Sequence, residues 1–547
     1  MSPPRGTPAW PPDLIAEPAP SRAGAVWFGL AVAALALWDL GGRSLFHRDL
    51  PRFAVIAREM LQSGDWLVPH QHGETYANKP ILYVWLVALP SALVGDPTAF
   101  LLRLPSALGL VLLALATSAW GRARTGSAAV GRLAGLLAVT TMLTNELGRV
   151  GRPDLLATAF GTAAAMLLDR ASLGRGARSD PWVAGLLLGA SHLTKGPVGL
   201  VVAAAVLALP DPAVPWRERL RRARPLLALG VSLLVAAAWI VPAWLREGGD
   251  FVRRLAFDQV AERVAGRGNH REAWFYYLVE LPQVWLPWSP VLVGALLACA
   301  SRRVRERLVV GPLPAVVAVT LLVFSCVPTK EVRYASVVVP PLAVVAAAAV
   351  RALLLRAADP RRAARHLLAG GVAAVVAGCA MGAAGAWWPS SLPWVLPPAL
   401  LAAATGVAAG VRARRGGEAA PALAGRAVGV AVVVVACGFA AYWGVLARYL
   451  VVNGVRENAA VAAVLPAGVP TVLVVARGLE PDDLYDAVRR PVPVRRGDAV
   501  PSRDALRDAV VLCEAGEREA VERARGGALS VLLARPRARG GTLLVLR

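Results

Sequence analysis

Three lysines stand out in a chain whose other 56 basic residues are all arginine. They are Lys79 in YANKP, Lys195 in LTKGP and Lys330 in PTKEVRY. A lysine ammonium is a compact cation on a flexible stem, which suits a phosphate oxygen as its partner. Lysines at the ends of membrane spans also reach toward lipid headgroups without any catalytic role. Because all three fall between apolar segments on the same expected side of a membrane, we favour phosphate binding.

Acidic residues and further cations gather in two polar segments of the same expected side. The first segment contributes Asp49, Arg52, Arg58, Glu74 and Tyr76, and the second contributes Arg152 and Asp154. The cations would stabilise a departing phosphate, and a carboxylate would act on the acceptor or on positive charge developing on a sugar. Simpler roles are a helix cap for Asp49, and a cap with a mutual surface ion pair for Arg152 and Asp154.

The histidines of the first segment do not define a metal site. His47, His70 and His72, with Glu59 and Glu74, have no spacing that fixes a coordination geometry. We therefore expect neither a bound metal nor another cofactor.

The elements that must position these residues are membrane-spanning helices. The chain is 56% hydrophobic and 17% charged, whereas a soluble domain carries about a quarter of charged residues. Apolar runs recur near 24–41, 100–120, 128–146, 155–170, 182–194, 197–210, 225–244, 282–300, 310–327, 336–354, 366–388, 393–411 and 427–447. We expect a polytopic α-helical membrane domain over 24–447 with about thirteen transmembrane helices.

The net charge of +23 is concentrated in alternate loops between these runs. Six windows from 121–132 to 411–426 hold 24 arginines against seven acidic residues. Short basic loops mark the cytoplasmic side, so the basicity indicates topology and not a nucleic-acid partner. We expect a disordered cytoplasmic tail over 1–23 and extracytoplasmic loops over 42–99 and 245–281, here called the first and second outer loops.

Two apolar segments at the outer side allow more than one interpretation. The run 81–95 is short and contains Pro90, which favours a re-entrant or interfacial segment. The sequence AWFYYLVELPQVWLPW (273–288) is equally compatible with the wall of a groove for an apolar chain and with an interfacial aromatic belt.

The composition changes after Tyr449. Short apolar segments predict strands at 471–476, 509–515, 530–536 and 542–547, and DDLYDAVRR and GEREAVERARG predict helices. We expect an extracytoplasmic α/β domain over 448–547.

The chain resembles the ArnT-type polyprenyl-phosphate-sugar glycosyltransferases, which share the GT-C superfamily with the protein O-mannosyltransferases. The resemblance is carried by RDLPRFAVIAREMLQSGDWLVPHQHGETYANKPILYVWL (48–86), FLLRLPSALG, GRPDLLATAF, LTKGPVGL, the FYYL and LPW segments, and KEVRYASVVVPPLAVV. It runs from about residue 24 to 350, and only its first stretch is specific by itself. It implies a GT-C fold with thirteen spans and a C-terminal periplasmic α/β domain.

The resemblance also implies roles for particular residues. Asp49 matches the catalytic acid of the family, although Leu50 stands where a second acid is usual and Ile81 replaces a proline in the KPP motif. Residues that match donor-phosphate or active-site positions are Lys79, Arg152, Asp154, Lys195, Arg333 and Tyr334.

The implied activity is transfer of a sugar, 4-amino-4-deoxy-L-arabinose or a hexose, from undecaprenyl phosphate. The acceptor would be lipid A or another envelope glycolipid or protein, at the outer face of the inner membrane, with inversion at the sugar. One alternative is a transporter or flippase of lipid-linked sugars, which predicts internal repeats and ionisable residues at mid-membrane. Another is a non-catalytic envelope assembly protein that binds through its C-terminal domain.

Overall fold

The computed structural model describes residues 22–38, 40–41, 50–258, 271–289, 310–354, 463–464, 471–474, 494–496, 509–525, 528–536 and 542–546. They fall into two compact units. The first takes its residues from Met1–Trp38, Ala77–Tyr83 and Arg103–Gly444, and the second from Asp39–Tyr76, Val84–Leu102 and Val445–Arg547. Residues 1–21 of the expected tail and the expected spans after residue 355 lie outside the described residues, so the number of thirteen spans stays a prediction.

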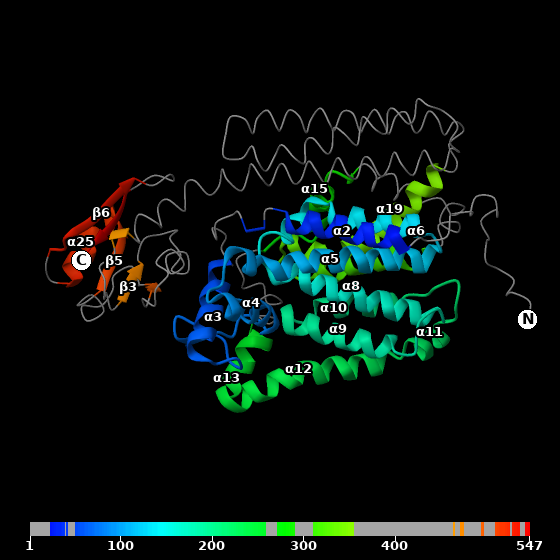
Figure 1. The fold of residues 1–547 in the computed structure, drawn as a ribbon, viewed down its shortest axis with the longest axis horizontal. Coiled ribbons are helices and arrows are strands. Elements are labelled where there is room, and N and C mark those ends of the chain that lie inside the picture. Colours follow the sequence, from blue (N-terminus) through cyan, green and yellow to red (C-terminus); the bar gives the residue numbers. More distant parts are fainter. Residues whose placement is uncertain are drawn as a thin grey trace, which may run out of the picture. The chain divides into compact units, whose positions relative to one another are not determined.

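The first unit is built from helices, most of which follow the expected apolar runs (Figure 1), whereas α11 and α13 lie in the expected loops 211–224 and 245–281. They are α2 (Arg22–Leu37), α5 (Ala99–Thr125), α6 (Ala128–Val139), α7 (Met142–Leu147), α8 (Pro153–Ser172), α9 (Asp180–Lys195), α10 (Val198–Ala208), α11 (Trp216–Ala223), α12 (Pro225–Glu247), α13 (Gly249–Val252), α15 (Tyr276–Val284), α18 (Leu313–Cys326) and α19 (Val339–Leu354). Among the described residues, three helical stretches are long and apolar enough to cross a membrane: Ala99–Thr125, Trp216–Glu247 and Val332–Arg351.

One expected span is broken in the structure. The run 128–146 forms α6 and then the separate helix α7, because Thr140 ends the first helix and Thr141 caps the second. The Thr141 hydroxyl accepts a hydrogen bond from the Thr144 backbone N–H, which replaces a helical bond at that point. By contrast, α4 (Leu82–Val94) has the short length expected for 81–95, since its 13 residues span about 20 Å.

Helix α8 is held by close backbone packing against α10. A Cβ placed on Gly199 would lie 2.7 Å from Gly161 Cα and 2.8 Å from Ser191 Oγ. Only glycine permits this approach, so the start of α10 lies directly against the middle of α8.

We expect Gly199→Ala to destabilise the protein by about 1–3 kcal/mol, because the backbones would have to separate. The matched control is Gly230→Ala in α12, where a Cβ meets no atom within 4 Å. Thermal unfolding of the purified protein in one detergent tests this prediction. Equal unfolding midpoints for the two variants would contradict it.

A buried ion network stabilises the C-terminal end of α8. Arg124 of α5 forms salt bridges with Asp169 of α8 and with Asp211, and all three side chains are at most 3% exposed. The Trp120 indole N–H also donates to Asp169, at 2.8 Å. The network ties α5, α8 and the segment after α10 together at the end of α8 opposite to its first turn.

The second unit contains the described part of the first outer loop except Ala77–Tyr83, which belongs to the first unit. Helix α3 (Leu50–Ser63) is followed by the hairpin of β1 (His70–Gln71) and β2 (Glu74–Thr75). Both turn residues, His72 and Gly73, have positive φ, at 56° and 79°. The Glu59 carboxylate accepts their backbone N–H groups at 2.8 and 3.1 Å, which fixes the hairpin to α3.

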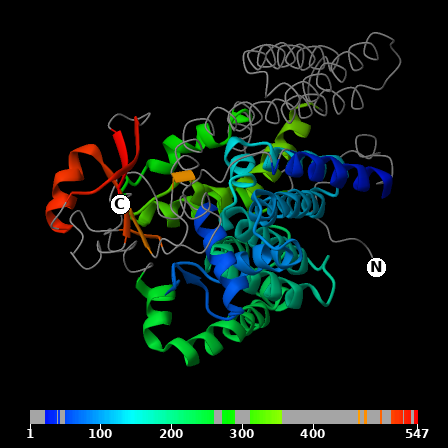
Figure 2. The ribbon, with the colours of Figure 1, turned by 60° about the vertical axis from the view of Figure 1, so that its left-hand side comes forward.

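The C-terminal residues form a mixed five-stranded sheet in the order β4-β3-β5-β7-β6. Its strands are β3 (Thr471–Val474), β4 (Val494–Arg496), β5 (Ala509–Glu514), β6 (Val531–Pro536) and β7 (Thr542–Leu546), with β3 parallel to β4 and β5 and the other pairings antiparallel. Helix α25 (Arg518–Arg525) lies alongside these strands (Figure 2). Strand β4 was not expected from the sequence, and the expected helix at 482–490 lies outside the described residues.

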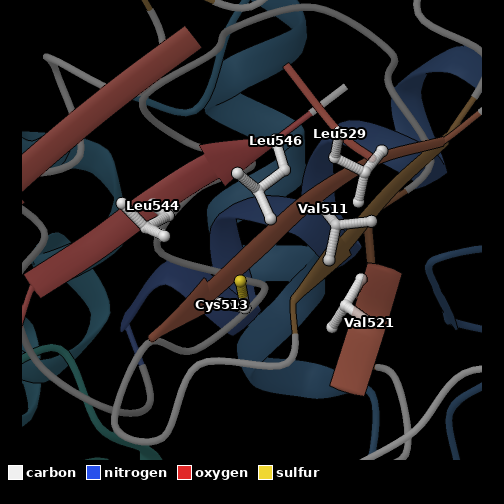
Figure 3. Close-up of a cluster of buried hydrophobic side chains, with 6 residues drawn as sticks. All are labelled: Val511, Cys513, Val521, Leu529, Leu544 and Leu546. Atoms are coloured by element: carbon white, nitrogen blue, oxygen red, sulfur yellow. The ribbon is translucent and has the colours of Figure 1, made fainter. Parts of the chain in front are cut away.

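Side chains alternate between the two faces of each strand, and those on one face of this sheet pack against α25. Val511 and Cys513 of β5 and Leu544 and Leu546 of β7 point toward Val521 of the helix (Figure 3). Val510 and Leu512, on the opposite face of β5, are also at most 1% exposed. Both faces of the central strand are therefore buried, as its continuous apolar sequence predicts.

Candidate active site

A buried ion cluster forms where the first turn of α8 meets the last turn of α9. The Lys195 ammonium donates a hydrogen bond to Asp154 Oδ1, and their side chains are 7% and 5% exposed. Arg333 lies at its other side, with Nε 3.4 Å from the same oxygen. Three segments far apart in the sequence thus place two cations on one carboxylate.

Local sequence explains why these side chains stand at helix ends. Arg152 occupies the N-cap position of α8 and Pro153 its first turn, so Asp154 lies where the helix dipole favours a negative charge. Lys195 occupies the last turn of α9, where the dipole favours a cation, and Gly196 ends the helix at a φ of 91°. Since α8 and α9 pack along each other, the two favoured charges meet.

The electrostatics of the cluster keep Asp154 ionised. Asp154 precedes the expected span 155–170. Burial alone would raise its pKa, but the positive charges of Lys195 and Arg333 hold the pKa at about 2. Arg152 adds a further favourable charge interaction. The carboxylate is therefore ionised at neutral pH, and it is a buried residue with several cationic neighbours, not a surface residue paired only with Arg152.

The 3₁₀ helix η2 (Val332–Val338) supplies the rest of the cluster. Arg333 Nη2 lies 2.5 Å from each carboxylate oxygen of Glu331. The Tyr334 hydroxyl donates to the same carboxylate at 3.2 Å, and Lys195 Nζ lies 4.6 Å from the centre of the Tyr334 ring. Sequence analysis missed Glu331, although its position between Lys330 and Arg333 was a signal that could have identified it.

Lys330 has a different environment. Its ammonium is buried and donates to the backbone carbonyl of Glu272 at 3.0 Å. Arg271 and Thr329 form a β-bridge beside it, and the buried Tyr277 hydroxyl donates to the Glu331 carbonyl at 3.3 Å. In the structure Lys330 thus holds the end of the second outer loop to the segment before η2.

Two other expected cations lie in the first unit. Lys79 is half-buried just before α4. Arg152 is half-buried, and its carbonyl accepts a hydrogen bond from Ser106 Oγ at 2.7 Å. Ser106 in turn pairs with the Tyr83 hydroxyl at 2.9 Å, which anchors the start of α8 to α5 and α4.

The remaining expected residues belong to the second unit. Arg58 is buried in a salt bridge with Asp96 at 2.9 Å, which ties α3 to the segment before α5. Arg52 is half-buried, Glu74 is exposed and Tyr76 is buried. Asp49 lies outside the described residues, as does His47. Within the ranges that the structure describes, no group of three or more metal-ligating side chains comes together.

The aromatic sequence 273–288 divides between two environments. Tyr277 and Trp285 are buried, whereas Trp274, Phe275, Leu278 and Leu286 are exposed. Helix α15 therefore presents an apolar outer surface while its inner face supports the segment before η2.

Two family models match parts of the chain. The model described as dolichyl-phosphate-mannose-protein mannosyltransferase matches residues 78–241. The model described as the Alg9-like mannosyltransferase family matches residues 270–386. The two matches together include every described member of the ion cluster.

Relatives with a stated activity are similar over about half of their length. The undecaprenyl phosphate-alpha-4-amino-4-deoxy-L-arabinose arabinosyl transferase of Edwardsiella ictaluri is 32% identical over 280 residues, which cover 49% of this chain and 50% of that protein. The same-named protein of Serratia proteamaculans is 31% identical over 296 residues, covering 52% and 51%. This chain thus spans about half the length of these relatives.

The whole fold is similar to a solved structure. ArnT from Cupriavidus metallidurans bound to undecaprenyl phosphate superposes with a TM-score of 0.71 and 19% identity, covering 96% of this chain and 98% of that one. Its ligand-free structure gives a TM-score of 0.70 with the same coverage. The chain therefore has the ArnT-like GT-C fold, that of a polytopic α-helical membrane protein with a C-terminal α/β domain.

Proposed function

We propose that this protein is an integral-membrane glycosyltransferase that takes its sugar from undecaprenyl phosphate. The observation that carries the proposal is the pair of cations, Lys195 and Arg333, held around the buried and ionised carboxylate of Asp154. Such preorganised cations stabilise charge as it develops on a leaving phosphate. Further support comes from the ArnT-like fold, whose similar solved structure carries undecaprenyl phosphate, and from the activity named for the relatives.

In the proposed reaction, the bond between the anomeric carbon and the phosphate oxygen breaks. Its electron pair stays on the phosphate, and the acceptor oxygen forms the new bond on the opposite face of the sugar, with inversion. Lys195, Arg333 and Lys79 would bind the phosphate, with Arg152 and Tyr334 supporting them. Asp49 would accept the proton of a hydroxyl acceptor, or would orient groups if the acceptor is an ionised phosphate.

The proposed acceptor is lipid A or another envelope glycolipid or protein, and the proposed sugar is 4-amino-4-deoxy-L-arabinose or a hexose. The basic loops support an orientation with the N-terminus in the cytoplasm and with the site and the C-terminal domain 448–547 on the outer side. The transporter alternative is less favoured, because the clustered ionisable residues stand at helix ends and not at the middle of the spans.

The test is sugar transfer by purified protein reconstituted with undecaprenyl-phosphate-linked sugars and lipid A. We expect free undecaprenyl phosphate to be released in amounts equal to the glycosylated acceptor. Lys79→Ala should raise the KM for the donor about tenfold, because a charge-assisted phosphate contact is lost. Arg253→Ala, which removes an exposed cation of the second outer loop, is the matched control.

A different result would support the transporter instead. In that case intact lipid-linked sugar would cross the bilayer, and none of the undecaprenyl-phosphate-linked sugars tested would release undecaprenyl phosphate. Release without dependence on Lys79 would remove that lysine from the site while leaving the enzyme class intact.

A further inference from the structure

The ion cluster contains a carboxylate that the proposed chemistry does not use. Glu331 holds Arg333 at 2.5 Å and accepts the Tyr334 hydroxyl at 3.2 Å, and its side chain is 20% exposed. A second anion at a site for phosphate opposes binding by its charge, so its presence needs a chemical reason.

The charge balance of the cluster supplies that reason. Among the side chains around Asp154, Lys195, Arg333 and Arg152 are cations and Glu331 is a second anion, while the Glu146 carboxyl interacts with Arg152. Glu331 thus lowers by one unit the positive charge that a bound phosphate meets. The donor carries a single negative charge, because a phosphodiester links its sugar to the polyprenol.

The product has a different charge. When the bond to the sugar breaks, the electron pair remains on the phosphate, which becomes a monoester. With a second pKa of about 6, a phosphate monoester carries a charge near −2 at neutral pH. A cluster without Glu331 would have one more positive charge and would therefore strengthen binding of the product more than binding of the donor.

We propose that Glu331 sets the charge of this site so that the enzyme discriminates the donor diester from the product monoester. This inference rests on the proposed function, since it requires the phosphate to bind at Lys195 and Arg333. The negative charge of Glu331 partly offsets the positive charges of these cations. It therefore limits the affinity of the site for the product, undecaprenyl phosphate. The exposure of Glu331 permits this role, whereas the buried Asp154 fixes the geometry of the cations.

The experiment compares two non-reacting probes on full-length protein in nanodiscs at pH 7.5. The probes are undecaprenyl phosphate, a monoester, and its methyl ester, a phosphodiester. Glu331→Gln keeps the shape and an acceptor for Tyr334 but removes the charge. We expect it to bind the monoester about fivefold more tightly, to bind the diester about twofold more tightly, and to show stronger product inhibition.

Glu331→Ala also removes the charge and should change the ratio of the two Kd values in the same direction. Glu331→Asp keeps the charge and should leave the ratio near that of the wild type. The matched control is Glu272→Gln, because the Glu272 side chain is exposed while its backbone makes the contacts to Pro328 and Lys330.

The outcomes separate this inference from the proposed function. If Arg333→Ala and Lys195→Ala weaken both probes but Glu331→Gln leaves the ratio unchanged or weakens the monoester, the role of Glu331 is wrong and the phosphate site stands. If Arg333→Ala and Lys195→Ala leave both Kd values unchanged, the phosphate does not bind here and both proposals fall.

Discussion

Replacing Asp49 with asparagine is expected to lower kcat for sugar transfer by about a hundredfold to ten-thousandfold, the range that a positioned acid or base contributes. Asparagine keeps the size of the side chain but neither accepts a proton nor stabilises positive charge on the sugar. Because the donor phosphate would be bound by other residues, the KM for the donor should change by less than about threefold. The measurement is steady-state transfer by equal amounts of reconstituted wild type and variant.

The matched control for Asp49→Asn is Asp65→Asn in the same outer loop. Asp65 Oδ1 accepts the backbone N–H groups of Leu67 and Val68, both at 3.1 Å. An asparagine oxygen can accept the same bonds, so the loop should keep its structure and the enzyme its activity. Full activity of Asp49→Asn would exclude the catalytic role and leave Asp49 as the helix cap that its position before α3 also permits.

The sequence singled out particular cations but did not identify the groups that they contact. The rarity of lysine singled out Lys195, and the structure places it on Asp154. Lys330 met the same criterion but binds a backbone carbonyl, because rarity indicates that a lysine is needed and not what it contacts. Glu331 was missed because an acid beside an arginine normally indicates a surface ion pair.

The helices could be predicted for a simple physical reason. A membrane requires long apolar helical runs, so composition and loop charge locate them without knowledge of their packing. Packing itself was not predictable. The arginines of 121–132 and 211–224 indicated only topology, yet Arg124 lies in a buried network with Asp169 and Asp211. The break at Thr140 involves the Thr141 hydroxyl that caps α7, a contact that apolar periodicity does not report.

The second large effect is expected at Asp154. In Asp154→Asn, Lys195 and Arg333 would lose the counter-ion that they share. An amide cannot balance two positive charges, so the cations would separate and the phosphate site would lose its geometry. We expect kcat/KM for transfer to fall at least about a hundredfold, with weaker binding of undecaprenyl phosphate, since preorganised donors of this kind contribute effects of that size.

Asp169→Asn is the matched control for Asp154→Asn, because it makes the same substitution at the opposite end of the same helix. Both carboxylates are at most 5% exposed and both are paired with cations. Asp169→Asn breaks a buried ion network and should lower the free energy of unfolding by about 3–5 kcal/mol. The protein that remains folded should keep its KM for the donor. If the two variants lose stability and activity in the same proportion, Asp154 serves only the fold. Loss of phosphate binding in Asp154→Asn alone would establish that the carboxylate assembles the active site.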